Sequence, residues 1–598
     1  MGIQERLAQL RRKMEEHNLD MYFIPTNDFH GSEYISGYFK CREFISGFTG
    51  SAGNIVVTQE EAGLWTDGRY FLQAEAQLAG TGFTLYRAGQ EGVPGVNQYV
   101  LSKIPEGGRL GVDGRMVSEA WAEGMRKMLA GKKAKLDIKK DLISEIWLDR
   151  PELIHEKAWL LGEKYAGESR SDKLKKLRTF MAKRGKGQML LTSLDDIAWL
   201  LNIRGNDIPY NPVVFSYLVV KEDECFLFAG KGIFTAEERR ILEQDGIVLR
   251  DYDDIYDYVK SIPAGGRAFV DKRTANAAIV ESFSKETKVK DIVCPVIEWK
   301  AVKNPIEIEN EKKAHIRDGV AVTKFICWLK QNIDKMPLTE IKAAEKLEDF
   351  RKLGKHYLGP SFEPIAGYAE HGAIVHYSAT PETDARLLPE NFLLLDTGGQ
   401  YLEGTTDITR TVLLGGKATT EQKKYYTAVL RGNLNLLAAK FMHGCSGVAL
   451  DYAARQPLWE MGCDFNHGTG HGVGYLLNVH EAPNGFTYKI LKGPGKNAVL
   501  EEGMITSDEP GIYLAGKYGI RLENLILCVK REKNEFGQFM GFEPLTLVPF
   551  DRDAIDAEQM SGKELAFLNQ YHQKVYDTLE EYLTSDEREW LADMCAPL

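Results

Sequence analysis

Apolar positions at helical spacing open the chain and lead into a short apolar run. Within residues 1–20, apolar side chains recur every three or four positions, which predicts an amphipathic helix, and the run MYFIPT at 21–26 predicts a buried strand. The same order of helix and strand returns at a constant offset of 167 residues. The matched helical positions are Leu7, Leu10, Arg11 and Met14 in the first copy and Leu174, Leu177, Arg178 and Met181 in the second. We therefore predict two related α/β domains over residues 1–155 and 156–303.

A third domain is predicted to begin at Asn304. This residue, Pro305 and Glu307 supply an N-cap, a proline at the first helical position and a capping-box acid, which together predict the start of a long helix. The last fifty or so residues again have helical periodicity and predict a packed C-terminal extension. The length of 598 residues suggests about four domains, and three larger ones are equally compatible with it. We assign residues 304–598 to one domain that ends in this extension.

The region from residue 392 to 525 concentrates acids and histidines among apolar and glycine-rich segments. Asp396 directly follows an apolar run that predicts a buried strand, and Asp407 lies in a threonine-rich run of high β-propensity. Glu523 shares a face with Arg521 on a strand predicted to continue into the apolar segment after it. We therefore expect three carboxylates borne on strands. Glycines flank nearly every acid and histidine of the region, as close approach of the backbone to a ligand requires.

These carboxylates favour a metal site when they are taken together. Any one of them alone is more often a solvated strand residue or a turn cap than part of a site, but an inward carboxylate is costly unless it is paired or binds a metal. One ion would be over-supplied by two aspartates, two glutamates and a histidine, whereas two ions can share bridging carboxylates. Two divalent ions carry four positive charges, which four carboxylates balance, and a hydroxide that bridges the ions is then easily held.

Six segments of the third domain carry a family resemblance. They are, in order, LLLDTGGQY, GTTDITRT, HGTGHGVG, VHEAP, SDEPG and GIRLEN. They resemble the signature segments of the pita-bread metallopeptidase family, and length and spacing are most similar to its three-domain, cytosolic-type Xaa-Pro aminopeptidases (aminopeptidase P). The resemblance extends to WTDGRYFLQA near the N-terminus and FEPLTLVP near the C-terminus. It implies an α/β (α+β) chain in which two creatinase-like N-terminal domains precede a pita-bread catalytic domain over residues 304–598.

The resemblance also implies a dinuclear metal site. The ligands it implies are Asp396, Asp407, His471, Glu509 and Glu523. One histidine among five ligands leaves an oxygen-rich site, which suits manganese better than a structural zinc, although cobalt or zinc could occupy it as well.

The remaining implied roles belong to residues around these ligands. Glu509 is implied as a proton shuttle as well as a ligand, and His480 as a donor to the oxyanion. His376 and His467 are expected to orient the peptide, and Arg521 to fix the orientation of a carboxylate ligand. Arg69, from WTDGRYF, is expected either to contact the substrate or to form a structural salt bridge.

The activity implied by the resemblance is hydrolysis of the N-terminal Xaa-Pro bond of peptides by a metal-bridging hydroxide. A prolidase that cleaves Xaa-Pro dipeptides is the alternative within enzymes, and three domains rather than two favour the aminopeptidase. A metal-free binding module of the same fold is a further alternative, against which the presence of all five implied ligands argues. Peptides with proline in second position are therefore the expected partners, and the family suggests a homodimer.

Composition and charge limit the possible partners, the location and the state of the cysteines. The formal charge of −11 argues against nucleic acid or an anionic membrane as the main partner. No run of eighteen apolar residues and no secretory apolar segment occurs, so we expect a cytoplasmic protein. The eight cysteines are dispersed and form no CxxC pair, which predicts reduced thiols rather than a disulfide framework.

Overall fold

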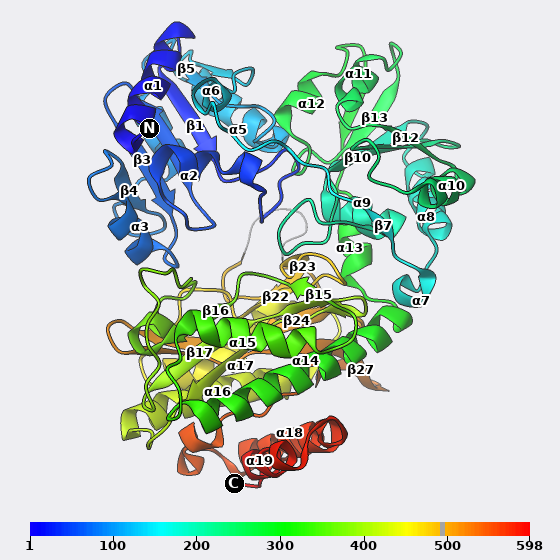
Figure 1. The fold of residues 1–598 in the computed structure, drawn as a ribbon. Helices are drawn as coiled ribbons and strands as arrows, with labels where there is room; N and C mark the ends of the chain where they lie inside the picture. Colours follow the sequence, from blue (N-terminus) through cyan, green and yellow to red (C-terminus); the bar gives the residue numbers. More distant parts are fainter. Residues whose placement is uncertain (491–496) are drawn as a thin grey trace. The chain divides into compact units, whose positions relative to one another are not determined.

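The computed structural model describes residues 1–490 and 497–598 and has a mixed α/β architecture (Figure 1). The chain divides into two compact units, one of residues 1–162 and 168–296 and the other of residues 163–167 and 297–598. The predicted α/β class is therefore confirmed. All eight cysteines are unpaired, as expected. Every helix in the described part of the chain is too short or too polar to cross a membrane.

The first unit contains two six-stranded sheets with the same strand order. The orders are β4-β3-β2-β1-β5-β6 and β12-β11-β10-β8-β13-β14, so that β1 corresponds to β8 and β5 to β13. The strands of the first sheet are β1 (Met21–Pro25), β2 (Asn54–Thr58), β3 (Ala62–Thr66), β4 (Thr84–Arg87), β5 (Arg109–Gly111) and β6 (Lys135–Asp137). Those of the second are β8 (Gln188–Leu191), β10 (Ser216–Val220), β11 (Cys225–Ala229), β12 (Ile247–Asp251), β13 (Arg267–Val270) and β14 (Lys288–Asp291). The repeated order confirms the two related N-terminal domains.

The first strand of each repeat has one antiparallel and one parallel neighbour. Strand β1 lies between antiparallel β2 and parallel β5, and β8 lies between antiparallel β10 and parallel β13. The helices of this unit are α1 (Ile3–Glu16), α2 (Cys41–Ser46), α3 (Phe71–Leu78), α4 (Val96–Lys103), α5 (Glu119–Ala130), α6 (Leu142–Ile146), α8 (Arg170–Ala182), α9 (Leu194–Leu201), α10 (Ala236–Gln244), α11 (Asp254–Lys260) and α12 (Ala277–Glu281). Helices α1 and α8 are the predicted opening helices, and their matched apolar residues are all buried.

The second unit combines long helices with short sheets. Its helices include α14 (Pro305–Asn332), α15 (Glu340–Lys352), α16 (Thr420–Leu437) and α17 (Gly447–Trp459), and α14 packs against α15 and α16 against α17. The sheet orders are β15-β18-β19, β16-β17-β20, β21-β28-β27-β24-β22-β23 and β25-β26. The strands are β15 (Tyr357–Pro360), β16 (Ile365–Tyr368), β17 (Phe392–Thr397), β18 (Gly399–Tyr401), β19 (Gly404–Thr405), β20 (Ile408–Leu413), β21 (Phe441–Met442), β22 (Gly470–Gly472), β23 (Glu481–Phe486), β24 (Ile505–Asp508), β25 (Gly511–Leu514), β26 (Tyr518–Arg521), β27 (Asn524–Asn534) and β28 (Gly537–Pro544).

The predicted C-terminal extension forms α18 (Gly562–Leu579) and α19 (Ser585–Cys595), and both pack against α14. Tyr571 of α18 ties this extension to strand β20, because its hydroxyl accepts a hydrogen bond from the Arg410 guanidinium at 3.0 Å. The same guanidinium donates to the backbone oxygen of Glu523 at 2.6 Å. The extension therefore supports the backbone around a predicted metal ligand.

The predicted start of α14 is confirmed in detail. The Asn304 Oδ1 accepts hydrogen bonds from the backbone N–H groups of Ile306 and Glu307, both at 3.0 Å, and Glu307 Oε2 accepts from the Asn304 N–H at 2.9 Å. The amide Nδ2 of Asn304 also donates to the Ala166 oxygen at 2.8 Å.

Replacing Asn304 by alanine should destabilise the second unit. Loss of an N-cap acceptor typically costs about 0.5–2 kcal/mol, so we expect a lower midpoint for this unit in a thermal unfolding scan. Asn304→Asp is the matched control, because it keeps the cap acceptor and loses only the donor to Ala166. If both variants lose the same stability, the bond to Ala166 and not the cap is the stabilising interaction.

Candidate metal centre

The five predicted ligands come from five separate segments of the second unit. Asp396 lies in β17 and His471 in β22, whereas Glu509 directly follows β24. Asp407 lies in the break before β20, and Glu523 lies in the break between β26 and β27. The expectation that all three of Asp396, Asp407 and Glu523 are borne on strands is therefore wrong for Asp407 and Glu523.

The break at Glu523 has a clear structural cause. Strand β26 pairs with β25 in a two-stranded sheet, whereas β27 belongs to the six-stranded sheet, so the chain crosses between two sheets at residues 522–523. There the Glu523 N–H donates to the oxygen of Thr409 at 3.0 Å, across to β20. The predicted continuous strand ends because its two halves have different partners, and this leaves Glu523 beside β20.

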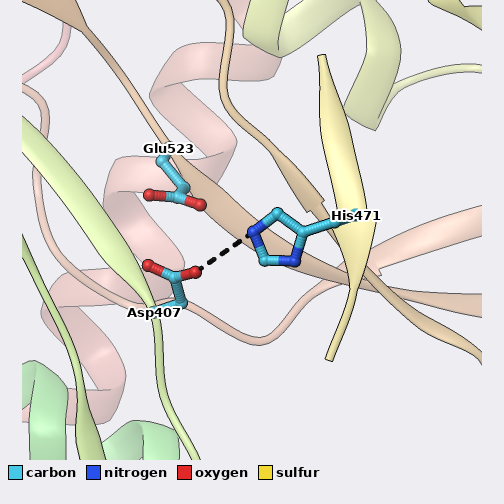
Figure 2. Close-up of side chains that lie close together, drawn as sticks. All are labelled: Asp407, His471 and Glu523. Carbon is cyan, nitrogen blue, oxygen red and sulfur yellow. Dashed lines mark ion pairs between the residues drawn. The ribbon is translucent and has the colours of Figure 1, made fainter. Parts of the chain in front are cut away.

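Three of the predicted ligands converge closely. One ligand atom each of Asp407, His471 and Glu523 lies within 4.8 Å of the other two (Figure 2). The His471 Nε2 atom is 3.5 Å from Asp407 Oδ2 and 3.5 Å from Glu509 Oε1. Glu523 and Asp407 are buried, and His471 and Glu509 are partly exposed. The arrangement is a cluster of carboxylate oxygens with one imidazole nitrogen.

The tautomer of His471 follows from its other ring nitrogen. Its Nδ1 lies 2.9 Å from the Gly472 backbone oxygen, which can only accept, so Nδ1 carries a proton. In neutral His471 the Nε2 lone pair therefore faces the carboxylates of Asp407 and Glu509. Such a contact is repulsive unless a cation lies between the groups or the ring takes up a second proton. The orientation of His471 thus fits a metal ligand.

Burial and the charges of neighbouring side chains shift the pKa values of the acids and of the histidine in this site. Burial, followed by repulsion from neighbouring carboxylates, raises the pKa of Glu509 to about 7 and that of Glu523 well above its ordinary range. Burial also raises the pKa of Asp396. Burial alone would lower the pKa of His471, but its bond to Asp407 and the charge of Glu509 raise it to about 9. All four shifts favour the bound proton, which a cation in the site would replace.

Asp396 adds a direct sign of a missing partner. Its Oδ1 is buried and has no hydrogen-bond partner among the residues that the structure describes, whereas its Oδ2 accepts from Arg521 Nη2 at 2.5 Å. A buried carboxylate oxygen without a donor is costly. The candidate metal-binding atoms are mostly carboxylate oxygens with one imidazole nitrogen, and oxygen ligands suit hard divalent cations.

Arg521 and Thr409 hold the carboxylates in place. The Thr409 hydroxyl donates to Glu523 Oε2 at 2.8 Å and accepts from Arg521 Nε at 3.2 Å. Arg521 is almost fully buried. One guanidinium thus contacts Asp396 directly and Glu523 through Thr409, which agrees with the orienting role predicted for Arg521.

Tyr513 is a residue beside the candidate site that the sequence analysis missed. Its hydroxyl accepts from Arg521 Nη1 at 2.7 Å and lies 2.8 Å from His467 Nε2. It therefore links the predicted peptide-orienting histidine to the arginine behind the metal site. The only signal in the sequence was a tyrosine two residues after Gly511, on the same face of a short strand next to SDEPG.

Ser507 and Arg455 support the two histidine segments. The Ser507 hydroxyl accepts from the His471 N–H at 2.9 Å and donates to Glu509 Oε1 at 3.1 Å. The Arg455 guanidinium, which is fully buried in α17, donates to the backbone oxygen of His467 at 2.7 Å. His480 lies beside the predicted ligand His471, and the centroids of the two rings are 4.3 Å apart.

A buried glutamate, which the sequence analysis also missed, holds the loop that carries His376. The fully buried Glu340, at the start of α15, accepts from the Tyr377 hydroxyl at 2.8 Å and from the Tyr368 N–H at 2.7 Å, and its Oε1 lies 2.9 Å from His371 Nδ1. His376 itself is partly exposed and directly precedes Tyr377. His371 thus has a structural partner.

Arg69 belongs to the first unit and forms a salt bridge there. Its Nε and Nη2 donate to the two carboxylate oxygens of Asp67, both at 2.7 Å, and its side chain is about one third exposed. This matches the structural alternative that we considered for Arg69. A contact with substrate stays a prediction.

Models of known protein families match four parts of the chain. The creatinase/prolidase N-terminal domain matches residues 6–144, and a second model of the same description matches residues 149–307. Metallopeptidase family M24 matches residues 309–530, and the C-terminal region of peptidase M24 matches residues 538–598. All five predicted ligands fall within the metallopeptidase match.

Full-length relatives carry consistent names. The chain is 38% identical to "Aminopeptidase P2" of Arabidopsis thaliana, over 100% of this chain and 89% of the relative. It is 39% identical to "Probable Xaa-Pro aminopeptidase P" of Coprinopsis cinerea, over 99% and 98%. Among solved structures, the X-prolyl aminopeptidase of Caenorhabditis elegans, described as a cytosolic enzyme with a di-nuclear active site, matches with a TM-score of 0.94 and 33% identity over 100% of both chains.

Replacing Asp407 by asparagine should remove most of the stabilisation by divalent metal. A ligand that binds only the folded state adds about 2.7 kcal/mol at 100 times its dissociation constant, so metal should raise the unfolding temperature of the wild type. We expect a much smaller rise in Asp407→Asn, measured by scanning fluorimetry with chelator and with added Mn²⁺. Asp577→Asn, which removes an exposed carboxylate on α18, is the control. An equal rise in both variants would contradict a ligand role for Asp407.

Proposed function

Because the chain belongs to metallopeptidase family M24, we propose that it is an Xaa-Pro aminopeptidase that releases the first residue of peptides with proline in second position. The observation that carries this proposal is the convergence of Asp407, His471 and Glu523, whose ligand atoms lie within 4.8 Å of one another in a buried, acid-rich site. Full-length similarity to proteins named Xaa-Pro aminopeptidase favours this activity over dipeptide cleavage by a prolidase.

We propose that the site holds two divalent ions. The proposed ligands are the predicted five, Asp396, Asp407, His471, Glu509 and Glu523. The excess of carboxylate oxygens supports manganese, with cobalt and zinc as alternatives. When bound, paired divalent ions supply a water molecule activated for attack and polarise the carbonyl of the scissile bond.

The other proposed roles belong to side chains of the chain itself. Glu509 takes a proton from the attacking water and passes it to the proline nitrogen, and its Oε1 is held by the Ser507 hydroxyl. His480 donates to the carbonyl oxygen as negative charge develops on it. His376 and His467 orient the peptide, and Tyr513 and Arg521 keep His467 and Asp396 in position.

The proposal also covers the domains, the location and the oligomeric state of the protein. We keep the division into domains of residues 1–155, 156–303 and 304–598. We also propose that the protein is a cytoplasmic homodimer. The similar nematode enzyme is described as cytosolic, which supports the proposed location. Arg69 is proposed as a residue near the substrate.

Replacing His480 by alanine should lower kcat far more than it raises KM, because its proposed partner is an oxyanion that exists only near the transition state. Loss of one such donor typically lowers kcat about 10²- to 10³-fold. His443→Ala is the matched control, since His443 is half exposed and its ring pairs with Glu501 at 2.9 Å. An unchanged kcat with a raised KM would show that His480 is a ground-state contact.

The proposed specificity is tested by a peptide panel with manganese. We expect cleavage of Arg-Pro-Pro at its first bond and little turnover of acetyl-Arg-Pro-Pro, because an amide cannot replace the cationic ammonium that faces the carboxylate-rich site. Arg-Ala-Pro should also be a poor substrate. A preference for the dipeptide Arg-Pro would move the assignment to prolidase, and rapid cleavage of Arg-Ala-Pro would remove the proline requirement.

A further inference from the structure

A cleft of about 570 Å³ lies in the first unit, where its two repeats meet. Residues 25–29, which follow β1, and residues 115–118, which follow β5, line it from the first repeat. Residues 273, 274 and 276, which follow β13, line it from the second. None of the proposed metal ligands lines it. Its volume falls within the range of small-molecule sites, about 300–1,000 Å³.

The topology of the first sheet places its ligand-binding edge at this cleft. In the first repeat, β2 pairs with one side of β1 and β5 pairs with the other side, and β1 and β5 are parallel. The second repeat does the same at β8 and β13. Open α/β sheets bind ligands beyond the carboxyl ends of strands at such switch points. Here the switch point of the first repeat lines the cleft from both of its strands, and the second repeat adds the segment after β13.

The wall between the repeats is built from paired backbone. The Ala277 N–H donates to the Val117 oxygen and the Glu119 N–H to the Ala275 oxygen, both at 2.9 Å. Ser118 and Asn276 sit opposite each other in this pairing and cap the helices α5 and α12. The groups that line the cleft therefore have fixed positions before any ligand enters.

One part of the cleft offers hydrogen-bond donors to an anion. The N-terminal ends of α4 and α5 both line it, but the first N–H groups of α5 are taken, because those of Glu119 and Ala120 donate to the Ala275 and Lys272 oxygens. The N-terminal end of α4 has no side-chain cap, because its N-cap residue is Gly95. Helix N-termini favour anions, because their first N–H groups lack intrahelical partners. Arg115 lines the same cleft with its side chain about one third exposed, and bonds to Asp113 and Asp141 fix its guanidinium. A carboxylate is the anion best matched to a guanidinium and free N–H groups.

Asp28 gives the cleft a negative group as well. It is 1% exposed, and its Oδ1 accepts from the His30 and Ser32 N–H groups at 2.8 and 2.9 Å. Its Oδ2 is buried without a hydrogen-bond partner in the part of the chain that the structure describes, and no lysine or arginine there pairs with it. A buried carboxylate oxygen without a hydrogen-bond donor favours the binding of a cationic N–H group in the adjoining cleft.

An aromatic surface lies between these polar groups. The Trp121 ring lines the cleft and stacks on Phe23, with centroids 4.9 Å apart and planes inclined by 12°. Trp121 is partly exposed, so its outer edge is open to a ligand.

We propose that this cleft is a second, non-catalytic binding site for small zwitterions of the amino-acid or dipeptide class. The ligand carboxylate lies at the N-terminal end of α4 near Arg115, the ammonium group faces Asp28, and the side chain lies along Trp121. This site does not depend on the proposed peptidase activity, because the two share no residue.

The test is calorimetric titration of the full chain with two probes that lack proline, phenylalanine and glycyl-phenylalanine. Binding of either probe is expected, and whichever binds more tightly assigns the site to free amino acids or to dipeptides. Acetyl-glycyl-phenylalanine lacks the ammonium group and glycyl-phenylalanine amide lacks the carboxylate. Each should bind about ten- to a hundredfold more weakly than the dipeptide, the loss typical of a charge-assisted hydrogen bond.

Two variants locate the probe. Asp28→Asn keeps the oxygen that accepts from His30 and Ser32 and removes only the charge, so it should weaken binding about tenfold or more. Asn97→Asp places a negative charge at the exposed start of α4, where it favours the helix and repels a ligand carboxylate. It should also weaken binding, and it decides the test if Asp28→Asn fails to fold.

Asp407→Asn separates this site from the metal centre. Binding of the probes should be unchanged in that variant. Loss of binding in Asp407→Asn with retention in Asp28→Asn and Asn97→Asp would place the probe at the metal centre and overturn the proposal. Absence of binding of both probes to the wild type at millimolar concentration would overturn it as well.

Discussion

The repulsion among four carboxylates is the constraint on which the catalytic unit depends. Asp396, Asp407, Glu509 and Glu523 are held together where burial raises the pKa of three of them. Among the described residues, only Arg521 brings a lysine or arginine charge to the cluster by a direct bond, at Asp396. The unit must therefore hold these segments against a force that would separate them. Bound cations would attract all four carboxylates. The cluster that destabilises the metal-free chain would therefore stabilise the metal-bound chain.

Two buried arginines show how the fold resists this repulsion. Arg351 of α15 bonds to Asp318 of α14 and to Thr397, the residue after Asp396, so that both long helices are fixed to the end of β17. Arg410 of β20 bonds to the Glu523 backbone and to Tyr571 of the C-terminal extension. Each of these two ligand-bearing segments is thus anchored to a helix through a guanidinium whose bonds are to oxygen. The extension, which has no ligand of its own, contributes to the site in this way.

Local features of the sequence were sufficient for much of this architecture. The cap at Asn304, the buried strand before Asp396 and the repeated helix and strand of the N-terminal half depend on neighbouring residues, and they were predictable for that reason. The breaks at Asp407 and Glu523 were not, because they arise from pairing between β20 and the segment after β26, more than a hundred residues away. Tyr513 and Glu340 were missed for a related reason. Each acts through partners that only the folded chain brings near, and neither residue type signals a site by itself.

The two N-terminal repeats also differ in a way that bears on the cleft between them. Their first strands match at an offset of 167 residues, but Arg115 and Ser118 match Arg273 and Asn276 at an offset of 158. Most of the difference lies before α4, because residues 88–95 separate β4 from α4, whereas only residues 252 and 253 separate β12 from α11. The longer connection includes Gly95 and leads to the helix end that lines the cleft. A duplicated pair with identical connections would present two equivalent edges. The longer connection in one copy instead brings an uncapped helix end to a single cleft, which therefore has chemically different ends.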